Sequence, residues 1–233
     1  MYSNSLRMAW GVGGRGRILE AVIDANAEGL LSTKPALVIS SMRSEIEHVA
    51  RRHGIASRFI EGGRGKASEA FHCEFRAALA ERKIDWLGLT FNKLLATQTI
   101  DALQGKIFNV HMSLLPLFPG FGAVGNALSS SMRVAGVTVH MVGAGMDEGP
   151  ILGQAVSPIT ARDTETTLGR RLFECAVPLA LQMVRAIESR ELALDEKRQP
   201  RWSAWERWDK GCFFPALDPD LVDFAQAFGR RCE

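Results

Sequence analysis

The sequence has little that would direct the protein to nucleic acid or to a membrane. Its 28 Lys and Arg residues nearly cancel its 26 Asp and Glu residues, which leaves a formal net charge of +2 over 233 residues. Proteins that bind nucleic acid through charge usually carry a strong basic excess. No run approaches the roughly 18 consecutive apolar residues of a membrane span, and residues 1–9 lack the apolar core of a secretory signal. We therefore expect no nucleic acid and no membrane as a partner, and a cytoplasmic location.

Cysteine is also scarce, and its spacing indicates neither a metal site nor a disulfide framework. The four cysteines lie far apart, without a C-x-x-C pair or a neighbouring histidine cluster. Apolar residues make up 46% and charged residues 23% of the chain, which is typical of a globular protein and not of a disordered one. We expect a folded protein that holds no metal ion.

Short runs of β-type residues alternate with longer helical patterns along the first half of the chain. Strands are expected at 6–12, 36–40, 86–90 and 107–111, and helices at 18–25, 46–52 and 67–82. This alternation predicts an α/β fold with a doubly wound, mostly parallel sheet. Such sheets bind their ligands at the carboxyl ends of the strands, where the strand order reverses.

The pattern changes after Gly136. Two strand-like runs, 137–142 and 151–156, flank a glycine-rich loop and predict a hairpin or an antiparallel edge. Asp163 or Thr164 is then expected to cap a long helix, which Pro178 should kink. We expect one domain over residues 1–190 and a Trp-rich C-terminal extension over 191–233. Three indoles at 202, 205 and 208 would share one helical face, which predicts packing on the body or on a partner subunit and makes a homodimer a candidate assembly.

The first loop satisfies the pattern G-x-G-x-x-G, from Gly11 to Gly16, between a strand and a helix. Backbone amides at such a helix N-terminus suit a phosphate group. The acidic residue that would bind a ribose is missing after the second strand, although Ser41 and Arg43 would suit a 2′-phosphate. A phosphate site, an NADP site and a purely structural turn all remain open from this loop.

Asn109 and His111 form the most informative pair in the sequence. They lie two residues apart at the carboxyl end of an expected strand, so their side chains share a face. Polar side chains are poor filling for a buried parallel strand. A satisfied core histidine and a strand-ending asparagine would also explain the pair, so the pair alone leaves catalysis open.

Three segments that follow one another in the sequence settle which family it resembles. They read Asn-Val-His-Met-Ser-Leu-Leu-Pro-Leu-Phe-Pro-Gly at 109–120, Gly-Val-Thr-Val-His at 136–140 and Met-Asp-Glu-Gly-Pro-Ile-Leu at 146–152. Together they closely resemble the folate-dependent formyltransferases of the glycinamide ribonucleotide transformylase type. Residues 14–21 resemble that family's phosphate loop and residues 90–95 its folate-binding segment. The resemblance covers roughly residues 6–187.

The resemblance implies transfer of a formyl group from 10-formyltetrahydrofolate to a small amine, without a metal or a covalent enzyme intermediate. By position, Asn109, His111 and Asp147 match the catalytic trio. The chemistry is sensible, because the Asn109 amide and a protonated His111 would stabilise the negative charge on the formyl oxygen. Asp147 would favour the imidazolium and hold a water that carries the proton. An ordinary acidic turn residue remains the alternative for Asp147.

The resemblance also assigns the residues that bind the two substrates. The expected acceptor site is the backbone and side chains of the glycine loop, namely Gly14, Arg15, Gly16 and Arg17. The expected folate site is a segment after the fourth strand together with an apolar slot for the pterin ring, namely Asn92, Lys93, Leu94, Leu95, Val142 and Met146.

Three departures from the family pattern concern the acceptor. Arg17-Ile18 stands where the family usually has Ser-Asn, residues 121–125 replace a His-x-His stretch, and the final helix starts in a shorter spacing. Glycinamide ribonucleotide is the nominal acceptor. An amino sugar or a hydroxyornithine is the alternative acceptor, and an NADP oxidoreductase or a non-catalytic relative is the alternative outside the class.

Four further histidines are left. His140 fits the family pattern either as a direct contact or as a residue behind the site. The other three lie among charged residues on expected helices, where solvent exposure is expected, namely His48, His53 and His72.

Overall fold

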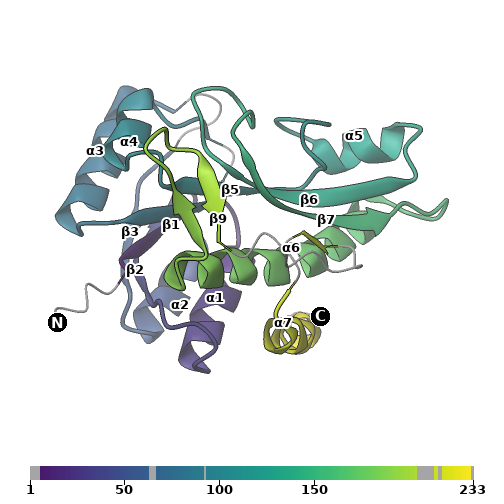
Figure 1. Ribbon diagram of the computed structural model, residues 1–233, viewed down its shortest axis with the longest axis horizontal. Coiled ribbons are helices and arrows are strands. Elements are labelled where there is room, and N and C mark those ends of the chain that lie inside the picture. The colour runs from purple at the N-terminus through teal and green to yellow at the C-terminus, as the bar shows by residue number, and fades with distance from the viewer. Residues whose placement is uncertain (1–5, 63–66, 92, 204–212, 215–216, 232–233) are drawn as a thin grey trace. The chain divides into compact units, whose positions relative to one another are not determined.

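The computed structural model describes residues 6–62, 67–91, 93–203, 213–214 and 217–231 (Figure 1). The chain divides into two compact units. The first comprises residues 1–109 and 142–144, and the second comprises residues 110–141 and 145–233. Strand β5 (Ile107–His111) passes from the first unit into the second after Asn109.

The first unit is a parallel sheet with crossover helices. Its strands are β1 (Met8–Val12), β2 (Pro35–Ser40), β3 (Ala56–Phe59), β4 (Trp86–Thr90) and the start of β5. Its helices are α1 (Arg17–Ala27), α2 (Ile46–Arg52), α3 (Glu69–Glu81) and α4 (Thr97–Ala102). Helices α1 and α2 lie on one face of this sheet and α3 and α4 on the other (Figure 1). The α/β class and the mostly parallel, doubly wound sheet expected from the sequence are confirmed.

The order of the strands in this unit creates a switch point. The chain runs from β1 outward through β2 to β3, and then returns so that β4 pairs with the other side of β1 and with β5. The loops that follow β1 and β4 therefore leave the carboxyl edge side by side, which is where open α/β sheets bind ligands. The expected strands at 86–90 and 107–111 agree with β4 and β5, whereas β3 was not predicted.

The core of this sheet is built by alternation. On one face, apolar side chains of the strands pack against apolar side chains of α3 and α4, namely Ala9, Leu37, Ile39, Leu87 and Leu89.

The prediction that His72 is exposed was wrong. His72 lies on α3 and is only 6% exposed, with its ring edge-on to Phe71, because it lies next to the apolar face of α3. His48 is exposed, as expected, and His53 is half-buried.

The second unit holds the antiparallel part of the structure. Its elements are α5 (Ala123–Ser129), β6 (Val134–Met141), β7 (Ile151–Pro158), α6 (Glu165–Glu188), β8 (Leu192–Leu194), β9 (Pro200–Trp202), β10 (Phe213–Phe214) and α7 (Pro219–Arg231). Strands β6 and β7 form the expected antiparallel pair, and their register shifts between Val139 and His140. A shift of this kind re-aims the side chains next to it.

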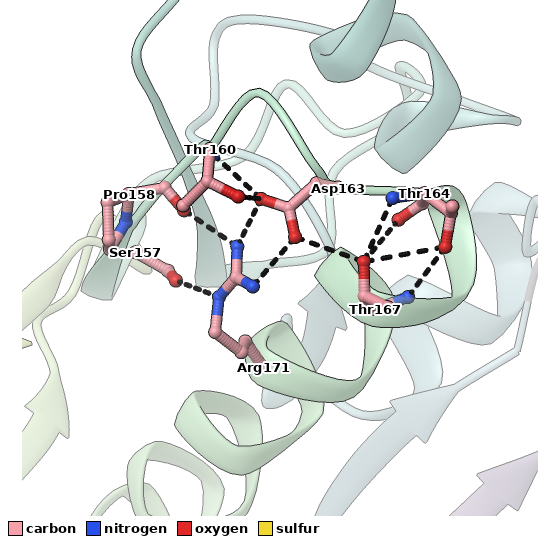
Figure 2. A network of polar contacts seen from close by, with 7 residues as sticks. All are labelled: Ser157, Pro158, Thr160, Asp163, Thr164, Thr167 and Arg171. Atoms are coloured by element: carbon pink, nitrogen blue, oxygen red, sulfur yellow. Dashed lines mark hydrogen bonds and ion pairs between the residues drawn. The ribbon is translucent and has the colours of Figure 1, made fainter.

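Helix α6 begins at a dense network of polar contacts (Figure 2). Thr164 is its N-cap, and Thr164 and Thr167 each accept a hydrogen bond from the other's backbone N–H in a capping box. Asp163 accepts two bonds from the Arg171 guanidinium, at 2.8 and 2.6 Å. These bonds and those from Thr160 hold the pKa of Asp163 well below its usual range. The network joins the end of β7 to the start of α6, and Pro178 lies inside the helix.

The C-terminal residues pack on α6 through α7. Phe224 and Phe228 of α7 are buried and stacked on each other. Arg185 of α6 donates to Asp218 and Asp220 at the start of α7, at 3.0 and 2.7 Å. The domain boundary at residue 190 stays a prediction. The helical face expected for the three indoles is wrong at Trp202, which is half-buried and ends strand β9, and Trp205 and Trp208 lie outside the described residues. Within the described residues, no helix is both long and apolar enough to cross a bilayer.

Candidate active site

The second unit places an aspartate between two histidines. The Oδ2 of Asp147 lies 3.4 Å from the Nδ1 of His111, and its Oδ1 lies 3.5 Å from the Nε2 of His140. His111 ends β5, His140 lies near the end of β6, and Asp147 lies in the loop between β6 and β7. The three side chains are 9%, 2% and 14% exposed, in that order. Two titratable rings and one carboxylate thus share a largely dry site.

Backbone groups of the loop after β5 complete this cluster. The N–H of Gly120 donates to Asp147 Oδ2 at 2.8 Å. The Nε2 of His111 lies 3.0 Å from the carbonyl oxygen of Phe118. A carbonyl only accepts hydrogen bonds, so Nε2 carries a proton here. Asp147 and Phe118 both have positive φ, at 56° and 54°, a conformation that side chains rarely adopt without compensating contacts.

The charges in the cluster are arranged to keep Asp147 ionised. Burial is the largest single influence and raises the pKa of Asp147. The contact with His140, the Gly120 N–H and the nearby His111 together outweigh burial, so the pKa lies below its ordinary value. The Nε2 of His111 faces the Phe118 carbonyl and its Nδ1 faces the carboxylate, so neighbouring oxygens orient both ring nitrogens.

The glycine loop lies in the first unit, at the switch point. Gly14 and Gly16 have φ of 93° and 72°. Gly16 is the N-cap of α1, so no side chain of the N-cap residue accepts a hydrogen bond from the first backbone N–H groups of the helix. A Cβ at Gly16 would lie 2.7 Å from Ile46, whereas a Cβ at Gly14 would meet nothing within 4 Å. Gly16 is therefore needed for packing, and Gly14 leaves its backbone open. Arg15 is exposed and Arg17 is half-buried.

The expected folate segment adjoins this loop. The N–H of Gly13 lies 3.4 Å from the Thr90 carbonyl, and a Cβ at Gly13 would lie 2.9 Å from Phe91. Of the predicted folate residues, Leu95 is buried and Val142 is half-buried in the same apolar cluster, whereas Leu94 is 44% exposed. Lys93 lies close to Gly62, and Asn92 lies outside the described residues. Met146, in the second unit, is 39% exposed and packs near Gly120.

The structure brings together His111 and Asp147 among the predicted catalytic residues. Asn109 is half-buried and is the last residue of the first unit before β5 continues to His111. His140, which the sequence left open as a direct contact or a residue behind the site, lies against Asp147, whereas the backbone groups of Phe118 and Gly120 were not predicted. Backbone groups leave no pattern in a sequence, but His140 and Thr138 lie two residues apart on an expected strand, and two polar residues on one face of it were a usable signal. Among the described residues, no group of three or more His, Cys, Asp or Glu side chains has the arrangement of a metal site.

Comparison with known proteins identifies the family. The family model for formyl transferases matches residues 6–184. The chain is 35% identical over 159 residues to phosphoribosylglycinamide formyltransferase of Bacillus subtilis, covering 68% of this chain and 78% of that protein. It superimposes on glycinamide ribonucleotide transformylase 1 of Symbiobacterium toebii with a TM-score of 0.78 and 30% identity, covering 87% of this chain and 97% of that one.

The chain therefore belongs to the formyl transferase family, and the protein is a formyltransferase. The family implies a folate-derived formyl donor. The chain is also 35% identical over 183 residues to the trifunctional purine biosynthetic protein adenosine-3 of Homo sapiens, which covers 76% of this chain but only 18% of that protein. This chain thus spans about a fifth of the length of the trifunctional relatives that it matches.

Proposed function

We propose that the protein transfers the formyl group of 10-formyltetrahydrofolate to the amine of glycinamide ribonucleotide, a step of purine biosynthesis. The names of the relatives from Bacillus subtilis and Symbiobacterium toebii support this acceptor. The observation that carries the proposal is the Asp147 carboxylate held between His111, His140 and the Gly120 N–H. A cytoplasmic location and a metal-free reaction are part of the same proposal.

The proposed reaction begins with attack of the neutral amine on the formyl carbon. A C–N bond forms, and the electron pair of the C=O bond moves onto the formyl oxygen. The amide of Asn109 donates to this oxygen, a role that rests on the resemblance and on its place two residues before His111. The ring of His111, whose Nδ1 lies 3.4 Å from Asp147, is the second donor, a role that also rests on the resemblance. Donors of this kind lower the barrier because the charge develops in front of them.

The proton then leaves the attacking nitrogen and reaches the leaving one. The lowered pKa of Asp147 keeps its carboxylate ionised near neutral pH, so it can hold a water molecule by accepting its hydrogen bond, and this water takes the proton from the new ammonium group. The same water delivers a proton to the folate nitrogen as its bond to the formyl carbon breaks. The products are the formylated amine and tetrahydrofolate, and the enzyme is unchanged.

The acceptor is assigned to the glycine loop. The open backbone at Gly14 and the uncapped start of α1 suit a phosphate, and the guanidinium groups of Arg15 and Arg17 replace the small side chains that the family usually has there. A guanidinium binds phosphate in a bidentate way but also fills space. If these groups fill the pocket, the acceptor is a different amine without a phosphate.

A panel of amines with 10-formyltetrahydrofolate tests the proposal. Free tetrahydrofolate and formate are measured separately, with glycinamide ribonucleotide, an amino sugar and a hydroxyornithine as acceptors. Tetrahydrofolate released only in the presence of glycinamide ribonucleotide supports the proposal. Tetrahydrofolate released only in the presence of another amine would identify that amine as the acceptor in place of glycinamide ribonucleotide. Formate produced at the same rate without any amine would show hydrolysis in place of transfer.

A further inference from the structure

A buried polar cluster beneath the site has no role in the reaction described so far. It consists of Ser113, Thr138 and Gln154 and lies wholly within the second unit. Thr138 is fully buried on β6, and Ser113 is 2% exposed in the loop after β5. Gln154 is half-buried and projects from β7, opposite Thr138 in the antiparallel register. Burying this many polar groups costs free energy unless each one is hydrogen bonded.

The Thr138 hydroxyl makes all of its hydrogen bonds within this cluster and to the loop after β5. It donates its single proton to the Ser113 carbonyl at 2.7 Å. It accepts from the Leu115 N–H at 3.0 Å and from the Gln154 amide at 3.1 Å. A hydroxyl has one donor and two acceptor positions, so Thr138 is saturated.

The Gln154 side chain is committed in the same way. Its NH₂ group donates to the Leu115 carbonyl at 3.0 Å and to Thr138, which uses both of its hydrogens. The loop is closed further by the Ser113 hydroxyl, which donates to the Leu117 carbonyl at 2.6 Å, and by the Leu117 N–H, which donates to Leu114. Thr138 and Gln154 thus hold the backbone at Ser113 and Leu115, and the Ser113 hydroxyl extends this hold to Leu117.

The residue that follows this fixed stretch is Phe118, whose carbonyl oxygen lies 3.0 Å from the Nε2 of His111. Phe118 has a φ of 54°, and such a conformation persists only where the surrounding structure determines it. The direction of this carbonyl decides which ring nitrogen of His111 is bound on that side and leaves Nδ1 facing Asp147.

We propose that Thr138 and Gln154 are positioning residues, which hold the loop at 113–118 so that the Phe118 carbonyl fixes the orientation and proton positions of the His111 ring. The expected effect on kcat rests on the proposed catalytic role of His111. The expected effect on the His111 ring does not rest on that role, so an experiment can contradict either one without the other.

The experiment compares matched variants of the full-length protein. Thr138→Val removes the hydroxyl at nearly constant shape, and Gln154→Leu removes the amide. Thr138→Ser keeps the hydroxyl and serves as the conservative variant. Arg171→Leu breaks the network at the start of α6 (Figure 2), in the same unit, and serves as a control for loss of stability alone. Two readouts are taken, the ¹⁵N signals of the His111 ring and the kinetic constants for formyl transfer.

The proposal predicts that Thr138→Val and Gln154→Leu shift the His111 ¹⁵N signals away from their wild-type values, most of all the Nε2 signal, because Nε2 loses its fixed contact with the Phe118 carbonyl. It predicts a kcat lowered about 10-fold or more, with both KM values within about twofold of wild type, since small misplacements of a catalytic group affect mainly the reacting step. Thr138→Ser should keep wild-type ¹⁵N signals and a wild-type kcat, and Arg171→Leu should lower only the Tm.

Wild-type ¹⁵N signals in folded Thr138→Val and Gln154→Leu would overturn the proposal. A loss of kcat in Arg171→Leu as large as theirs at a matched fall in Tm would also overturn it. Altered ¹⁵N signals with unchanged kcat would confirm the positioning of the ring and contradict the proposed role of His111 in the reaction.

Discussion

The Asp147 side chain accepts a hydrogen bond from the backbone and faces two imidazole rings, and this arrangement makes its charge the first property to test. In Asp147→Asn the carboxylate is lost while the shape is kept. We expect kcat to fall by about 10²-fold or more, as loss of a proton-transfer group typically does. The neighbouring Glu148 is exposed, so Glu148→Gln is a matched control with the same change of charge. Normal turnover in Asp147→Asn would remove this residue from the mechanism.

His111 and Asn109 should act together with Asp147. We expect His111→Ala and Asn109→Ala each to cost about 10²-fold in kcat, because each removes a donor to the developing oxyanion. A double variant should lose much less than the product of the two single losses, since the residues work as a unit. Multiplicative losses measured by steady-state kinetics would contradict a shared role.

The arginines of the glycine loop distinguish the two accounts of the acceptor. If they bind a phosphate, Arg15→Ala and Arg17→Ala should raise the KM for glycinamide ribonucleotide about 10-fold and weaken its dependence on salt. Arg51→Ala, at the far end of α2, changes the charge equally at the opposite edge of the sheet and should change neither. A KM unaffected by Arg15→Ala and Arg17→Ala would show that the acceptor is not bound here through a phosphate.

At the scale of elements, the β7–α6 connection should carry measurable stability. Thr164→Ala removes the N-cap of α6, and we expect the free energy of unfolding to fall by about 1 kcal/mol. In a chain of this size such a loss lowers Tm by roughly 2–4 °C. Kinetic constants should stay normal, because this cap contacts none of the proposed catalytic groups. Calorimetry measures the Tm, and an unchanged value would contradict the capping role.

The pH dependence of the same connection follows from Asp163. Its pKa is lowered in the folded protein by its bonds to Arg171 and Thr160, so its contribution to stability is present above the unfolded pKa of about 3.9 and is lost as pH falls through the folded value. Asp163→Asn should therefore be less stable than wild type at pH 7, and the difference should shrink in acid below about pH 4. A difference that is constant from pH 7 to pH 3 would contradict this account.

The elements also show what a sequence can predict. Strands β4 and β5 and helix α2 agree with the predicted ranges because apolar residues mark them clearly. Strand β3 was missed because its four residues are all half-buried and show no alternation. The prediction that His72 is exposed was wrong because its charged neighbours on α3 are typical of a solvent-facing residue, whereas the ring lies against Phe71. The Phe118 carbonyl and the Gly120 N–H were missed because the chain's conformation, and not its side chains, places them.

At the scale of the whole molecule, the C-terminal residues should be a structural part of the second unit. Phe228→Ala leaves a cavity between α7 and α6, where Phe228 is 2% exposed, and such substitutions cost about 3–5 kcal/mol. The exposed Gln226 lies on the same helix, so Gln226→Ala is the control. We expect a lower Tm and increased light scattering only for Phe228→Ala. Ending the chain after Glu188 should likewise reduce solubility or change the mass in solution.

The central claim is that the cluster around Asp147 transfers a formyl group to glycinamide ribonucleotide. The most direct measurement is a single assay of wild type and Asp147→Asn with 10-formyltetrahydrofolate and this acceptor, in which the formylated product is detected by mass. The account predicts that wild type forms one formylated acceptor per tetrahydrofolate released and that Asp147→Asn forms it about 10²-fold more slowly. Tetrahydrofolate released without a formylated acceptor, or equal rates in the two proteins, would contradict it.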